Sequence, residues 1–111
     1  MNNLPPEVQG QYDELSTQIG RATLAGNFFG YFSATELEKQ RFKLVRKWAK
    51  KQKDKRALAD AESAASSTYY AASGNARANG KTFRAVRYLL WAAYYSNGAV
   101  DSAGGIKNLS T

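Results

Sequence analysis

The stretch SGNARANGKTF, residues 73–83, decides between two different folds, because it ends in Gly-Lys-Thr as phosphate-binding loops do. Such a loop needs a glycine, four residues, and then Gly-Lys-Ser/Thr, so that backbone N–H groups can surround the phosphates. Here five residues separate Gly74 from Gly80. Asn75 stands at the required spacing, and its side chain occupies space that the loop leaves to the ligand. The stretch therefore fails as a phosphate-binding loop.

The sequence around this stretch also argues against a parallel sheet. A phosphate-binding loop follows a buried apolar strand, whereas residues 66–73 read SSTYYAAS, and no other segment is a strand candidate. We interpret Ser73, Gly74 and Asn75 as helix breakers in a turn, with Thr82 capping a helix that begins at Phe83.

The composition excludes most catalytic and metal chemistry. A chain of 111 residues forms one domain and can bury a core without covalent staples. It contains no cysteine and no histidine, which removes disulfides, thiolate chemistry, the commonest general base and most zinc or iron sites. The nine acidic residues are scattered without calcium-loop spacing. We predict a protein that is not an enzyme and needs no cofactor or metal.

The hydrophobic segments indicate a cytoplasmic protein. The first ten residues, MNNLPPEVQG, lack the basic and apolar regions of a secretory signal. The longest strongly apolar run, YLLWAAYY at residues 88–95, is far shorter than the roughly 20 residues that span a bilayer. The missing cysteines agree with a reducing compartment.

Helical periodicity predicts the first helix and a following aromatic connection. Pro5 and Pro6 suit a helix start, and apolar residues follow at helical spacing up to a stop near Gly26 and Asn27. The connection NFFGYFS then carries four aromatic residues: Phe28, Phe29, Tyr31 and Phe32. We expect them to cover the core, with an exposed binding patch as the alternative.

A long basic helix is predicted next. SATELE offers capping boxes at Ser33 and Thr35, and we prefer one helix from about Thr35 to about Tyr70. Its apolar stripe is interrupted by Lys51, Gln52 and Lys55, so a break near Asp54 is the alternative.

The last helix is predicted from Phe83 to about Tyr95, with Asn97-Gly98 as its C-cap. One of its faces is predicted to enter the core: Phe83, Val86, Leu90, Ala93 and Tyr94. The expected architecture is an all-α bundle of three or four helices with one long basic helix. The helical domain covers residues 1–100, and residues 101–111 form a mobile tail.

Two groups of residues are candidates for binding. The chain carries a net charge of +7, and residues 39–56 contain ten basic residues against one acid, Asp54. Such repulsion suggests a polyanionic partner, and a solvated lysine-rich face is the alternative. The second group is a face of arginine and aromatic residues on the last helix, which suits base stacking or a protein interface but is also what a central core helix presents. The candidate residues are Lys43, Arg46, Lys47, Lys50, Lys51, Lys53, Lys55, Arg56, Arg84, Arg87, Tyr88, Trp91 and Tyr95.

Three functions are compatible with these residues. The leading hypothesis is a non-enzymatic protein that binds DNA, RNA or a nucleoprotein complex. The alternative is a small phage- or plasmid-type inhibitor or adaptor that binds a host protein assembly directly. The third is a homo-oligomer that associates through the first helix and exposed aromatic residues.

Overall fold

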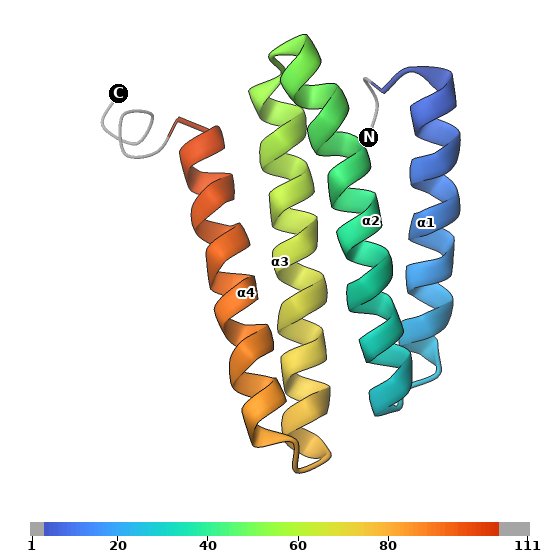
Figure 1. Ribbon diagram of the computed structural model, residues 1–111, viewed down its shortest axis with the longest axis vertical. Helices are drawn as coiled ribbons and strands as arrows, with labels where there is room; N and C mark the ends of the chain where they lie inside the picture. Colours follow the sequence, from blue (N-terminus) through green and yellow to red (C-terminus); the bar gives the residue numbers. More distant parts are fainter. Residues whose placement is uncertain (1–3, 105–111) are drawn as a thin grey trace.

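The computed structural model describes residues 4–104, which form four helices and, within that range, no strand. The helices are α1 (Pro6–Leu24), α2 (Phe28–Gln52), α3 (Lys55–Ala78) and α4 (Thr82–Ser102). They alternate in direction along the chain (Figure 1). The all-α prediction is confirmed. Residues 73–78 belong to the last turns of α3, so no strand precedes the Gly-Lys-Thr sequence.

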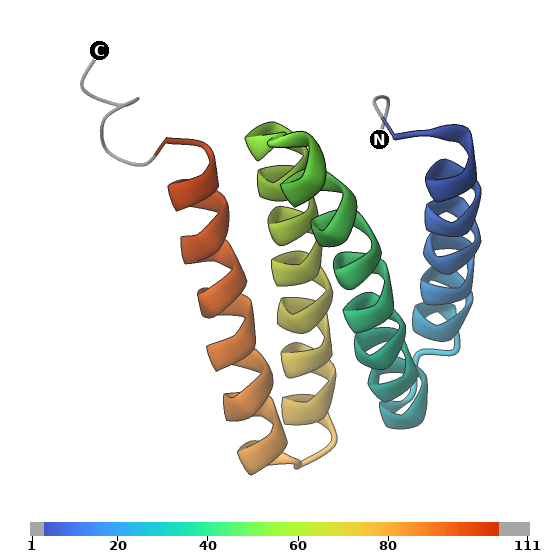
Figure 2. The ribbon, with the colours of Figure 1, turned by 45° about the horizontal axis from the view of Figure 1, so that its top comes forward.

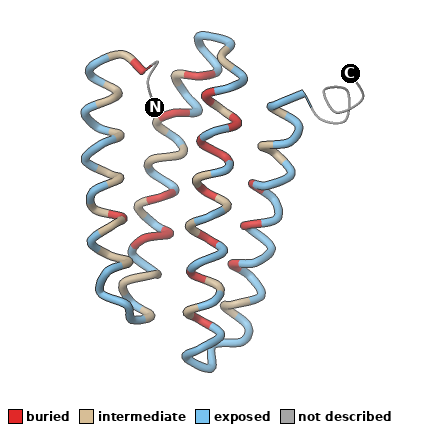
Figure 3. The backbone as a smooth tube through the Cα atoms, turned by 180° about the vertical axis from the view of Figure 1, so that it is seen from behind, coloured by how far each residue is buried: buried red, intermediate tan, exposed pale blue. Residues whose placement is uncertain are grey.

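The four helices pack in chain order. α1 contacts α2, α2 contacts α3 and α3 contacts α4, whereas among the described residues α1 and α4 share no contact. Figure 2 shows the helices side by side, with α1 and α4 at the two edges. The backbone accordingly measures 42 × 36 × 17 Å. Buried residues concentrate on α2 and α3, the two central helices (Figure 3).

The start of α1 was predicted correctly, but α2 begins earlier than predicted. Pro6 opens α1, and α2 begins at Phe28, where the side chain of Asn27 accepts a hydrogen bond from the Gly30 N–H at 2.7 Å. The predicted capping boxes at Ser33 and Thr35 are wrong, because both residues lie inside the helix. The aromatic residues of this segment divide: Phe28 and Tyr31 pack on the core, whereas Phe29 and Phe32 are exposed.

The predicted single helix over residues 35–70 is wrong, and the alternative break near Asp54 is correct. α2 ends at Gln52, and the next residue, Lys53, adopts the left-handed conformation with φ 56°. Asp54 then caps α3 by accepting a hydrogen bond from the Ala57 N–H at 3.0 Å. The break lets the two apolar stripes fold back on each other, instead of leaving the middle of a long helix solvated on all sides.

The turn between α3 and α4 lies later than predicted. Ser73, Gly74 and Asn75 do not break the helix, because α3 continues to Ala78. The chain reverses at Gly80, whose φ of 73° suits glycine. Thr82 is the first residue of α4 and not its cap.

The predicted core face of α4 is wrong. Tyr88, Ala92 and Tyr95 are buried against α3, whereas the predicted core residues Phe83, Val86, Leu90, Ala93 and Tyr94 are exposed. The predicted C-cap at residues 97–98 is also wrong, because α4 continues to Ser102. Residues 101 and 102 therefore belong to α4 and not to the predicted tail, and residues 105–111 of that prediction lie outside the described residues.

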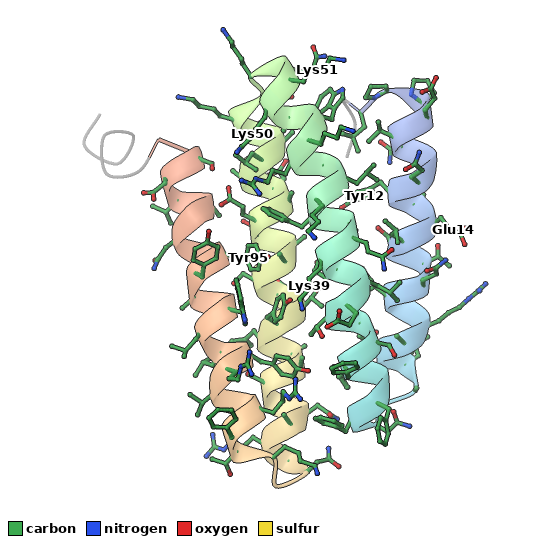
Figure 4. All side chains as sticks on the ribbon, in the orientation of Figure 1. Tyr12, Glu14, Lys39, Lys50, Lys51 and Tyr95 are labelled. Carbon is green, nitrogen blue, oxygen red and sulfur yellow. The ribbon has the colours of Figure 1, made fainter. Side chains whose placement is uncertain are left out.

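The core consists of two clusters. The larger joins α3 and α4 around Tyr69, Tyr88 and Tyr95, with alanines filling the spaces between the rings. The smaller contains Val45 and Ala61, and the half-buried Trp48 packs against it. α1 completes this second cluster with apolar side chains on its inner face. Its Glu14 points away from α2 into solvent (Figure 4).

A buried ion pair on α2 connects α1, α2 and α3 through hydrogen bonds. The Glu38 side chain is 1 % exposed and accepts two hydrogen bonds from the Arg41 guanidinium. Arg41 also donates to the Ser16 hydroxyl of α1 at 3.0 Å, and the Thr68 hydroxyl of α3 donates to Glu38 at 2.8 Å. Burial alone would lower the pKa of Arg41, but the hydrogen bond and the charge of Glu38 raise it.

Candidate functional site

A groove of about 350 Å³ runs along α3, between α2 and α4. We call it the basic-aromatic groove. Four cations of α2 and three aromatic residues of α4 line its two sides, and Phe42, Leu58 and Glu62 complete it. The residues on the two sides are Lys39, Lys43, Arg46, Lys50, Trp91, Tyr94 and Tyr95. Figure 4 labels Lys39 and Lys50 on α2 and Tyr95 on α4, on either side of α3.

The four cations form one row because of their spacing. Lys39, Lys43, Arg46 and Lys50 follow one another at steps of four, three and four residues, so they share one face of α2. Within residues 4–104, only Lys39 of this row has a carboxylate within 4.0 Å, that of Glu36 at 3.2 Å. The remaining three positive charges are not neutralised by ion pairs in the described structure.

The aromatic side of the groove is fixed by ring contacts. Tyr95 stacks on Tyr69 with ring centroids 5.7 Å apart and meets Phe42 edge-on at 4.9 Å. Trp91 and Tyr94 contact each other edge-on at 5.6 Å and remain exposed. Tyr95 is buried, so within the groove the faces of Trp91 and Tyr94 are the ones that a ligand can reach.

The charge of the groove is positive. Its four cations face one carboxylate, Glu62, which accepts a hydrogen bond from the Ser102 hydroxyl at 2.6 Å. Burial raises the pKa of Tyr95, and Tyr94 and Glu38 add to this effect, while the charge of Arg46 opposes it. The phenol therefore stays protonated at neutral pH, and the lining residues carry three net positive charges.

A smaller pocket of about 50 Å³ adjoins the groove and shares Lys39 and Trp91 with it. Arg84, Arg87 and Tyr88 of α4 line this pocket together with residues of α2 and α3. The Arg84 guanidinium lies over the rings of Phe32 and Tyr88, at 5.6 and 5.8 Å from their centroids. Arg84 and Arg87 thus extend the positive surface, whereas Tyr88 is buried and belongs to the core.

The other predicted basic residues lie outside the groove. Lys47 and Lys51 are exposed on α2 but do not line it, and Figure 4 shows Lys51 at the end of the helix. Lys53 lies in the turn after α2, and Lys55 and Arg56 line a separate hollow beside the end of α4. The basic segment is therefore divided among different surfaces.

Sequence reasoning missed five residues of the groove: Lys39, Phe42, Leu58, Glu62 and Tyr94. Lys39 could have been found, because it extends the helical spacing of Lys43, Arg46 and Lys50. Tyr94 was assigned to the core, and no local pattern links Glu62 to the other groove residues.

The fold and the groove together define an all-helical bundle with a basic and aromatic surface. No protein-family model matches the chain, and no curated protein or solved structure is significantly similar to it. Among residues 4–104, no three histidine, cysteine or acidic side chains come together as a metal site would require. None of the helices in this range has the length and apolar character to cross a membrane.

Proposed function

We propose that this protein binds single-stranded nucleic acid in the basic-aromatic groove and acts by occupancy, without catalysis. The observation that carries this proposal is that the cation row of α2 and the exposed rings of α4 line one groove. Proteins that hold single strands combine a positive groove along the backbone with aromatic side chains on which bases stack.

The cation row supports contact with a phosphate backbone. Lys39 and Lys50 are eleven residues apart, which corresponds to about 16 Å along a helix. Lys43, Arg46 and Lys50 lack carboxylate partners in the described structure, so a ligand phosphate displaces no internal ion pair from them. Binding should therefore be strong at low salt and weaken as salt rises, because phosphate contacts release counterions.

The aromatic side supports a single strand over a duplex. Trp91 and Tyr94 present ring surfaces at the edge of the groove, and only unpaired bases expose faces that can stack on them. Stacking is tolerant of base identity. We therefore expect little sequence preference, with DNA and RNA both bound.

The experiment compares two triple variants with equal loss of charge. The groove variant is Lys39→Gln, Lys43→Gln and Lys50→Gln, and the control variant is Lys47→Gln, Lys51→Gln and Lys55→Gln. Affinity for a labelled single strand is measured by fluorescence anisotropy over a range of salt. The groove variant should lower the slope of log affinity against log salt by roughly 2, at about 0.7 per lost phosphate contact. The control should change it much less. Equal effects of both variants would show that diffuse charge, and not the groove, binds the strand.

Tyr94→Ala tests the aromatic contribution separately. Tyr94 is 65 % exposed, so its removal should spare the core. Loss of one stacked base should cost about 1–3 kcal/mol, or roughly 5- to 150-fold in affinity for a single strand. The affinity for a duplex of the same sequence should stay unchanged. If both affinities fall equally, Tyr94 does not stack on bases.

Direct binding to a host protein, as an inhibitor or adaptor, is the second candidate, and the exposed apolar residues of α4 favour it. A pull-down from host extract with and without nuclease separates the two. Partners held through nucleic acid are lost on nuclease treatment and at high salt, whereas an apolar protein interface persists under both conditions.

A further inference from the structure

α4 leaves an apolar face without a neighbour. This edge helix packs along α3. Among the described residues its backbone does not pack along α1 or α2. Large apolar side chains lie exposed on the opposite side, including Phe83 at 77 % and Leu90 at 66 %. A contiguous apolar patch of this kind on a small domain indicates an interaction surface.

The exposed residues follow a heptad spacing. Residues 83, 86, 90, 93, 97 and 100 are separated by steps of three, four, three, four and three, which places them at alternating a and d positions of a coiled coil. They are Phe83, Val86, Leu90, Ala93, Asn97 and Val100. All six are exposed, whereas the buried Tyr88, Ala92 and Tyr95 fall at the c and f positions facing α3. α4 therefore has two faces that suit helix packing. The face with Tyr88, Ala92 and Tyr95 is covered by α3, whereas the face with the six exposed residues, which we call the seam, is uncovered.

A hollow lies on α4 beside this seam, on the side of the basic-aromatic groove, with which it shares Trp91 and Tyr94. It measures about 400 Å³ and is lined by Arg87, Leu90, Trp91 and Tyr94. These residues are spaced i, i+3, i+4 and i+7 on α4. Leu90 is the one seam residue among these four.

We propose that the occupant of this face is a second copy of the same chain, whose α4 packs in parallel against this α4. Asn97 identifies the partner and the orientation. An apolar partner would leave its amide buried without a hydrogen bond, which is costly, whereas in a parallel pair of identical helices it meets the amide of its own counterpart. A single asparagine at an a position is a known means of setting register in coiled coils.

Charge is compatible with this pairing. None of the six seam residues is charged, and the charged side chains beside the seam are Arg87 and Asp101, one of each sign. α2 and α4 lie on opposite sides of α3 (Figure 2), so the α2 helices of two copies that pair through α4 stay apart. Screening over more than about 10 Å then removes most of their repulsion.

The available area is sufficient for a weak dimer. Phe83 is the one aromatic residue of the seam and contributes at most about 150–250 Å², so the six seam residues offer less than the roughly 800 Å² per partner of a standard interface. The dimer should therefore dissociate on dilution. Tyr94 borders both the seam and the basic-aromatic groove, so dimerisation brings the two grooves to either side of the seam. The pairing itself does not depend on nucleic-acid binding.

The first experiment measures the mass of nuclease-treated protein by sedimentation equilibrium over a range of concentrations. The wild type should approach twice the 12.2 kDa of one chain as concentration rises. Leu90→Glu should remain monomeric and keep its helical circular dichroism. The control is Leu24→Glu on α1, where the leucine is 86 % exposed, and it should dimerise like the wild type. A wild type that stays monomeric, or a Leu90→Glu variant that dimerises normally, overturns the proposal.

The second experiment reads the orientation and uses the absence of cysteine from the chain. In a parallel pair the two copies of residue 86 face each other at a separation that suits a disulfide. Val86→Cys should therefore cross-link to itself under mild oxidation. Cross-linking that requires mixing Val86→Cys with Asn97→Cys would demonstrate antiparallel helices and refute the parallel arrangement.

Discussion

Gly30 lies in the first turn of α2, tightly packed against the end of α1, and replacing it with alanine should destabilise the protein. A Cβ atom at this position would lie 2.3 Å from the backbone oxygen of Ala22 and 3.1 Å from the Cβ of Ala25. It would also lie 3.1 Å from the Asn27 oxygen that caps α2. Because the nearest atom belongs to the backbone, the end of α1 must move away from α2.

Two opposing effects determine the size of the change. Alanine is favoured over glycine within a helix by about 0.8–1.0 kcal/mol, and somewhat less in a first turn. Forcing an extra methyl group into a packed contact costs about 1–3 kcal/mol, and weakening the Asn27 cap costs about 1 kcal/mol more. The steric effect is larger, so we expect Gly30→Ala to lower the free energy of unfolding by about 1–3 kcal/mol.

Gly74→Ala is the matched control. Gly74 lies within α3, and a Cβ atom there would meet nothing within 4 Å. This variant should raise the free energy of unfolding by about 0.8–1.0 kcal/mol. Urea unfolding followed by circular dichroism measures both variants, with the urea dependence expected to stay constant. If Gly30→Ala is as stable as the wild type, the close approach of α1 and α2 at this point is incorrect.

Three further changes should affect stability. Burial raises the pKa of both Tyr69 and Tyr95 above 10.0. The stability that the two buried neutral phenols contribute to the fold is therefore fully present below pH 10 and is lost as pH rises through the raised pKa values. Unfolding at alkaline pH should follow tyrosine absorbance, and an unchanged loss of stability in Tyr69→Phe would exclude Tyr69 as a cause. Arg41→Ala leaves Glu38 buried without its partner and should cost about 3–5 kcal/mol in urea unfolding, so a cost below 1 kcal/mol would contradict the ion pair. Lys53→Gly removes the strain of a side chain at positive φ and should raise the free energy of unfolding by about 1 kcal/mol, which is measured as a modest rise in melting temperature. A lower melting temperature would refute this.

The sequence predicts the helices better than it predicts which face of α4 packs. Both faces of α4 are apolar and aromatic, so a hydrophobic stripe containing Leu90 and Tyr94 is as strong as the one that is buried. The deciding features are small residues that let helices approach. Ala72 of α3 and Ala92 of α4 lie in the core, and a Cβ at Gly98 would collide with the side chain of Glu62. Such complementarity between two helices is not visible in either segment alone.

The basic-aromatic groove was difficult to predict from the sequence for the same reason. Its cations lie in residues 39–50 and its aromatic residues in residues 91–95, and α3 brings them together. The sequence identified both groups as candidates. Their combination in one groove follows from the packing of α2 and α4 on α3 and from the break at Asp54, which was the less favoured alternative.

The order of packing along the chain has a consequence for how this protein folds. Each helix finds its neighbour through a loop of only a few residues, because α1 contacts α2, α2 contacts α3 and α3 contacts α4. Contacts close in sequence require little loop closure, so folding should be fast and can start at any of the three helical hairpins. The two edge helices are each held on one side, and they should open before the centre does. Amide hydrogen exchange should therefore be slowest in α3 and progressively faster toward α1 and α4.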